Sequence, residues 1–225
     1  MALNFSVDEA LTQIKNDGFY LIRDPAIGSQ IDDMIRSHSR FNFSDEKGFN
    51  FWRDNIQRDP RIRGIMNAME SDMGVKYLLG HRGSLLQDPT HIKTLRFGGQ
   101  QPDILTIQVW PKGSDAIYYH RSHTVNLPKY RGPTGVWELI PKDLENSGCD
   151  GERADLEQGG IVIFDTRMAI DMVKGRSQYY SYFTEAMVKR EHLVPLIPPP
   201  SQDINEVAKL GVHVGSRMDA ATGVT

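Results

Sequence analysis

The chain has 225 residues, 39% of them hydrophobic, and a formal net charge of −3, which is enough apolar material for one sizeable core. The near-balanced charge offers no basic excess for a nucleic-acid backbone and no polybasic patch for a membrane. A single cysteine excludes an intrachain disulfide framework and is typical of a reducing compartment. With no signal-peptide pattern and no apolar run of transmembrane length, we expect a soluble, cytoplasmic protein that binds neither nucleic acid nor membrane.

The first part of the sequence is predicted to be mainly helical. Ser6 and Glu9 have the spacing of a capping box, and apolar residues then recur at helical spacing over residues 7–16. The other expected elements of this part are a short strand and three helices, at 19–22, 27–39, 60–73 and 77–79. Residues 41–58 are polar and aromatic without clear periodicity, and we predict a surface excursion there.

The second part of the sequence is predicted to be a sheet. Short apolar and aromatic runs alternate with Gly, Pro, Asn and Asp turns. The expected strands lie at 92–97, 104–110, 116–119, 135–140, 161–164 and 179–187. Helices followed by closely spaced strands indicate an α+β chain whose second part is a sandwich or jelly roll. We expect one domain over 1–194, then a Pro-rich connector and C-terminal tail over 195–225 with a helix near 204–210.

The densest polar and aromatic cluster is the run Tyr118-Tyr119-His120-Arg121-Ser122-His123. Side chains alternate along a strand, so His120 and His123 cannot both point into one pocket unless the strand ends between them. Either Ser122 and His123 form a hydrogen-bonded turn that leaves the strand, or one histidine faces a substrate.

Charged residues gather at the end of the strand predicted at 161–164. They are Asp165, Arg167, Asp171 and Arg176. Opposite charges so close in sequence favour an ion pair that fixes a loop. The alternative is that one arginine faces a substrate carboxylate, which its planar guanidinium suits.

A second carboxylate precedes the strand predicted at 104–110, in the run Gln101-Pro102-Asp103. Pro-Asp favours a turn, while a partly buried Asp103 would suit a general base. Other catalytic motifs are missing from the sequence: there is no Walker lysine loop, no Gly-x-Ser-x-Gly elbow and no cysteine pair for zinc.

Three segments occur in an order and spacing that are typical of one enzyme family. They are Asp17–Ile22 after a helix, Leu105–Trp110 followed by Gly113-Ser114 and Arg121-Ser122-His123, and Gly159–Arg167. Together they resemble the phytanoyl-CoA dioxygenase-like branch of the iron and 2-oxoglutarate oxygenase superfamily, over roughly residues 7–190. The resemblance implies a double-stranded β-helix (jelly roll, cupin-like) with N-terminal helices packed on one sheet and a pocket between the two sheets.

The chain departs from this family at the metal-binding positions. A facial iron site needs two histidines and one carboxylate. The family's His-x-Asp corresponds to Gln101-Pro102-Asp103, and its second histidine corresponds to Ile170. Where the family's 2-oxoglutarate arginine should lie the chain has Tyr180-Ser181-Tyr182, and Arg176 comes too early. The pattern therefore predicts that the pocket remains while its iron site is lost.

The main hypothesis is a metal-independent enzyme on this fold, acting on a small natural-product-like molecule without oxidation: cyclisation, isomerisation, epimerisation or dehydration. The expected catalytic residues are His120, His123, Asp103 and Arg167. The expected substrate-binding residues are Trp110, Tyr118, Tyr119, Gln101, Arg96, Asp171 and Arg176. The histidines are proton-transfer candidates because their pKa lies near neutrality. No cofactor and no metal ligand is predicted.

Two alternatives stay open. One is an active Fe(II)/2-oxoglutarate-dependent dioxygenase, whose candidate ligands are His120, His123 and Asp103. The other is a non-catalytic pseudoenzyme subunit or ligand-binding protein that docks through its connector and tail. A homodimer or a complex with a partner subunit is also left open.

Overall fold

The computed structural model describes residues 5–37, 41–96, 99, 101–132 and 135–215. Its helices are α1 (Val7–Asp17), α2 (Pro25–Arg36), α3 (Glu46–Trp52), α4 (Pro60–Met73), α5 (Pro141–Asn146), α6 (Glu185–Arg190) and α7 (Ile204–Lys209), and a π-helix, η1 (Arg53–Gln57), continues α3. No helix in the described part of the chain is long and apolar enough to cross a bilayer.

The starts of the N-terminal helices follow from their capping residues. The Ser6 hydroxyl accepts the Glu9 amide in front of α1, as the capping box predicts. Asp24 and Asp59 cap α2 and α4, and each is followed by a proline at the first helical position. The cap at Asp24 explains why α2 begins two residues before its predicted start; the predicted residues 38–39 lie outside the described part of the chain.

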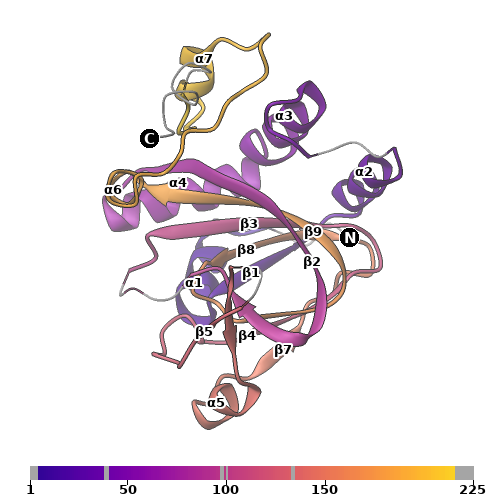
Figure 1. Ribbon diagram of the computed structural model, residues 1–225, viewed down its shortest axis with the longest axis vertical. Coiled ribbons are helices and arrows are strands. Elements are labelled where there is room, and N and C mark those ends of the chain that lie inside the picture. The colour runs from indigo at the N-terminus through magenta and orange to yellow at the C-terminus, as the bar shows by residue number, and fades with distance from the viewer. Residues whose placement is uncertain (1–4, 38–40, 97–98, 100, 133–134, 216–225) are drawn as a thin grey trace.

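The strands form one strongly curved antiparallel sheet. They are β1 (Phe19–Arg23), β2 (Tyr77–Thr94), β3 (Ile104–Trp110), β4 (Asp115–Tyr119), β5 (Tyr130–Arg131), β6 (Trp137–Leu139), β7 (Gly151–Arg153), β8 (Gly160–Asp165) and β9 (Ile170–Thr184). The hydrogen-bonded order is β1-β8-β3-β9-β2-β6-β5, and β4 pairs with β7 and β9. The second half of β9 pairs with β3 and its first half with β4, so the long strands β2 and β9 bend from one part of the sheet to the other (Figure 1).

The N-terminal helices cover one face of β3, β8 and β9, as predicted. One apolar cluster joins buried residues of α1, α2, α3 and α4 to Leu105, Ile107, Ile161, Ile163 and Tyr180 on the strands. The strands β3 and β8 are buried on both faces, and β8 accordingly reads as a continuous apolar run in the sequence from Ile161 to Phe164.

Several predicted elements were wrong in type or extent. The helix expected at 77–79 is the start of β2, an 18-residue strand of which only the end was predicted. Register shifts interrupt this strand at three places, and each breaks the alternation on which strand prediction relies. The last predicted strand begins at Ile170, well before residue 179, and ends at Thr184, where the Thr184 hydroxyl caps α6. The elements β5, β7 and α5 were not predicted.

The segment at 41–58 was wrongly predicted to be a surface excursion. It contains α3 and η1, and its aromatic side chains belong to the helix-side core. Trp52 is fully buried, with its ring 5.1 Å from Phe43 and 5.6 Å from Phe49. Its indole nitrogen donates to the Tyr182 hydroxyl at 3.0 Å, which ties this segment to β9.

The Pro-rich connector packs back onto the rest of the chain. Leu196 forms a β-bridge with Val214, and Val212 forms one with Leu79 at the start of β2. Val207 of α7 and Val212 are buried in the helix-side core. Residues 195–215 therefore contact the sheet directly, and residues 216–225 of the predicted tail lie outside the described part of the chain.

Candidate functional site

Side chains fill the space between the two parts of the curved sheet. The indole nitrogen of Trp110 donates to the Tyr118 hydroxyl at 3.2 Å, and this hydroxyl donates to Gln108 Oε1 at 2.7 Å. Gln108 Nε2 donates in turn to the Ser177 hydroxyl at 2.6 Å. Burial raises the pKa of Tyr118 far above its usual value, so its hydroxyl stays protonated. Trp110 and Tyr118 were predicted to bind substrate, but both are fully covered by protein.

We expect Tyr118→Phe to lower the free energy of unfolding by about 1–3 kcal/mol, because it leaves a buried donor and a buried acceptor unsatisfied. Urea unfolding followed by circular dichroism measures this. Tyr130→Phe is the matched control, because Tyr130 is 55% exposed and its substitution should change stability little. Equal effects of the two substitutions would contradict the buried hydrogen-bond chain.

The expected metal positions do not supply the ligand set of a facial iron site. Ile170 is buried beside Met172 in the apolar interior, directly across from Tyr118 in the β4–β9 register. Gln101 is exposed, and its carbonyl accepts the Asp103 amide at 2.8 Å in the predicted turn. Among the residues that the structure describes, no group of three His, Cys, Asp or Glu side chains is placed to hold a metal ion. The residues present therefore do not fit two histidines and one carboxylate.

The run after β4 is a hydrogen-bonded turn, which confirms one of the two interpretations of this segment. The Ser122 amide donates to the Tyr119 carbonyl at 3.2 Å, and β4 ends at Tyr119. His120 then lies between two carboxylates, with Nε2 2.7 Å from Glu152 and Nδ1 3.4 Å from Asp17. His123 has a different neighbour from His120. Its Nε2 lies 3.1 Å from a backbone carbonyl of α1.

His123 is buried next to the end of β8. A Cβ atom on Gly18 would lie 2.6 Å from His123 Nδ1, and Gly18 has a φ of 99°, so glycine is needed there on both counts. Burial lowers the pKa of His123, and the charges of Asp165 and Arg167 also act on it. His123 is therefore neutral at pH 7 and lies within electrostatic reach of these two residues.

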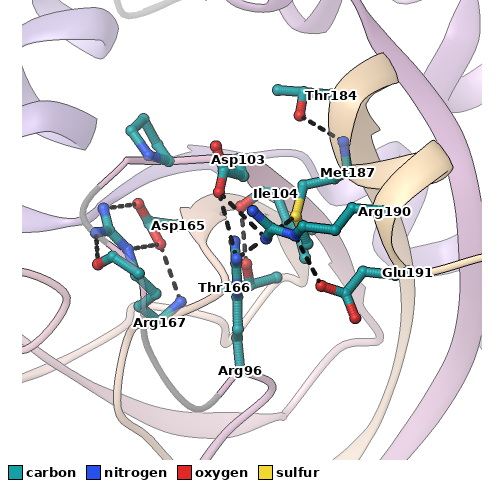
Figure 2. A network of polar contacts seen from close by, with 12 residues as sticks. Arg96, Asp103, Ile104, Asp165, Thr166, Arg167, Thr184, Met187, Arg190 and Glu191 are labelled. Atoms are coloured by element: carbon teal, nitrogen blue, oxygen red, sulfur yellow. Dashed lines mark hydrogen bonds and ion pairs between the residues drawn. The ribbon is translucent and has the colours of Figure 1, made fainter.

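Ionic side chains gather where β8 ends and β3 begins (Figure 2). We name the following set the Arg96 network: Arg96, Asp103, Lys129, Asp165, Arg167 and Arg190. Arg167 and Asp165 form the ion pair predicted from the sequence, with Nε–Oδ1 at 2.9 Å and Nη2–Oδ2 at 2.6 Å. The remaining Arg167 nitrogen, Nη1, donates to the Gly99 carbonyl at 2.7 Å. All three guanidinium nitrogens of Arg167 are thus engaged.

Arg96 links the second carboxylate of the network to α6. Its Nη2 donates to Asp103 Oδ2 at 3.3 Å and lies 3.6 Å from the Met187 sulfur (Figure 2). Arg190 Nη2 approaches the same Asp103 oxygen at 3.9 Å. Arg96 Nη1 is buried, and no described residue hydrogen-bonds to it. Asp103, expected to be a general base or iron ligand, is held in ion pairs.

Lys129, like Arg190, is a member of the network that sequence reasoning missed. Its amine donates to the Arg96 carbonyl at 3.4 Å. Burial lowers its pKa to about 8, the charges of Arg167 and Arg96 add to this effect, and Asp165 opposes it. Lys129 lies in the connection before β5, without a motif around it, so the sequence carries no signal of this role.

The sequence matches no known family model and no curated protein. The fold is similar to that of the epimerase SnoN from nogalamycin biosynthesis, in its complex with Fe3+, alpha ketoglutarate and nogalamycin RO, with a TM-score of 0.51, 14% identity and coverage of 79% of this chain and 83% of that one. The chain shares the fold of this epimerase. AviO1 from Streptomyces viridochromogenes Tue57 is a weaker match, with a TM-score of 0.45, 9% identity and coverage of 87% of this chain and 100% of that one. The match to SnoN confirms the predicted resemblance for the fold.

Within this SnoN-like fold, the remaining predicted residues lie outside the Arg96 network. Arg176 donates to the Ser84 hydroxyl at 3.2 Å, on the face of β9 opposite to Ser177. Burial, and then the nearby carboxylates Asp115 and Asp88, raise the pKa of Asp171. Tyr119 packs beside the apolar cluster that includes Leu144 of α5. The structure thus brings together Asp103, Arg96 and Arg167 from the predicted site, with His123 near them.

Proposed function

We propose that the chain is a metal-independent enzyme that catalyses a non-oxidative step on a small natural-product-like molecule, namely cyclisation, isomerisation, epimerisation or dehydration. The observation that carries this proposal is the content of the expected metal positions: Ile170 packs in the apolar interior, and Asp103 is bound by Arg96. The epimerase SnoN, which has this fold, supports the reaction and substrate class. We also infer that the curved sheet is a double-stranded β-helix.

Proton transfer in this proposal belongs to the Arg96 network and its neighbour His123. The Lys129 amine has a pKa of about 8, so it can give or take a proton near neutral pH. Neutral His123 is a second acceptor beside the network. Arg167, fixed by Asp165, supplies a positive charge that favours a developing oxyanion. None of these roles uses a metal ion.

An anaerobic titration with ferrous iron and 2-oxoglutarate tests the proposal. We expect no stoichiometric iron binding, because a single ion-paired carboxylate cannot replace two histidines and a free carboxylate. Retained iron after desalting and the charge-transfer absorption of a ternary complex are the two readouts, with an established iron and 2-oxoglutarate enzyme as the positive control.

Stoichiometric binding that is lost in His120→Ala would overturn the proposal in favour of an active dioxygenase. Asp17 lies 3.4 Å from the His120 ring, so it could bind the iron itself or only orient His120. The same titration on Asp17→Asn distinguishes these two roles.

A further inference from the structure

We propose that Arg96, Lys129 and Arg167 form a binding site for an anionic group, a carboxylate or a phosphate, on the small molecule that the protein takes. This inference rests on the proposed function, because it takes the ligand to be the substrate of the proposed enzyme. It adds the chemical class of that substrate. It also assigns the direct contact to Arg96 and Lys129, where the sequence pointed to Arg167 or Arg176.

The network carries an excess of positive charge. Its inner cations are Arg96, Lys129 and Arg167, and its carboxylates are Asp103 and Asp165. Arg190 adds no further excess, because it also pairs with Glu191 at 3.1 Å. An anion would interact favourably with the positive charge that these described residues place together.

The donor that is most open to an anion belongs to Arg96. Each guanidinium nitrogen of Arg167 already donates one bond, to Asp165 or to the Gly99 carbonyl. Arg96 Nη1, in contrast, is buried without a partner among the described residues. Buried donors are nearly always satisfied, so a ligand oxygen at Nη1 accounts for an atom that these residues leave unpaired.

The lowered pKa of the Lys129 amine reflects the positive potential beside Arg96 and Arg167. Burial and the charges of Arg167 and Arg96 oppose its protonation, and Asp165 favours it. The other titrating groups that interact with this cluster are His123 and Tyr77, which both couple to Asp165 and Arg167. A bound anion would offset the two guanidinium charges and favour protonated Lys129. By linkage, anion affinity should fall as the pH rises through about 8.

Isothermal titration of the full chain with inorganic phosphate and, separately, with benzoate tests the site, in chelator and without oxygen. We expect one anion per chain at pH 7 and at least tenfold weaker binding in Arg96→Met and in Lys129→Met. Arg36→Met is the matched control, because Arg36 lies on α2 with a side chain that is 74% exposed. Phosphate binding alone would identify a phosphorylated substrate, and benzoate binding alone a carboxylate.

The pH dependence provides a second readout that a structural role of these residues would not produce. Wild-type affinity for benzoate, which stays ionised over this range, should weaken from pH 7 to pH 9, and Lys129→Met should show no such change because it lacks the titrating amine. If Arg96→Met does not fold, Arg96→Lys is the alternative variant. It keeps the charge but replaces the guanidinium by a single amine, and it should still weaken binding.

Absence of binding by both anions, or an affinity that is unchanged in Arg96→Met or Arg96→Lys, would overturn this site. Such a result leaves the proposed function standing, because that proposal fails only through stoichiometric iron binding. The two failures are therefore distinguishable in the same protein preparation.

Discussion

Asp165→Ala is expected to lower the free energy of unfolding by about 3–5 kcal/mol, the loss typical of breaking a buried ion pair at one partner. The Asp165 side chain is 2% exposed and that of Arg167 is 8% exposed, so the stranded guanidinium cannot be solvated in place. Asp165 Oδ1 also accepts the Arg167 amide at 2.9 Å, and this bond is lost with it. Urea unfolding at pH 7, followed by circular dichroism, measures the change.

Two comparisons separate the stranded charge from the loss of packing. In the double variant Asp165→Leu with Arg167→Met neither charge of this pair is left stranded, so it should recover much of the loss. Asp33→Ala removes the partner of Arg36 in an ion pair whose side chains are both at least 70% exposed, and it should cost under about 1 kcal/mol. An effect of Asp165→Ala as small as that of Asp33→Ala would contradict a buried pair.

The sequence predicted elements whose signals are local. The capped helices α1 and α4 and the apolar strands β3 and β8 are encoded within a few residues each, and they were found close to their observed bounds. The strand β2 carries no such signal, because most of its middle is exposed or half-buried and bulges interrupt its register. Its partner β9 supplies the pairing from a distant part of the chain, which no local pattern records.

The candidate site also contains contacts that are local in the sequence and contacts that form only through the tertiary fold. The Asp165–Arg167 pair spans two positions in the sequence and was predicted, whereas Arg96 and Asp103 meet Lys129 and α6 only through the tertiary fold. Sequence reasoning placed Tyr118 in a pocket because polar and aromatic residues surround it. It could not foresee that Tyr118 would instead fill the interior opposite Ile170.

The positions of Ile170 and Tyr118 are connected. The position where the family would carry its second histidine holds a side chain of the apolar cluster, and the tyrosine across from it occupies the adjacent space. The interior is thus packed at the position where the resemblance implied a metal ligand. The ionic side chains of the Arg96 network lie at the end of the sheet.

Trp52→Ala is expected to lower the free energy of unfolding by about 3–5 kcal/mol, as for other large core side chains truncated to alanine. The reason is that Trp52 is fully buried among Phe43 and Phe49 and donates to Tyr182 across the helix–sheet boundary. Thermal and urea unfolding measure the loss, and Trp137→Ala on β6 is the control, because Trp137 is only partly buried.

This substitution discriminates between the two descriptions of residues 41–58. If the segment were a surface excursion, its tryptophan would contribute only about 0.5 kcal/mol or less, the range of ordinary surface substitutions. Trp52→Phe refines the result, because it keeps most of the apolar contact and removes the indole donor to Tyr182. We expect it to cost about 1–3 kcal/mol, and the difference between the two variants measures the packing that the aromatic segment adds to the core.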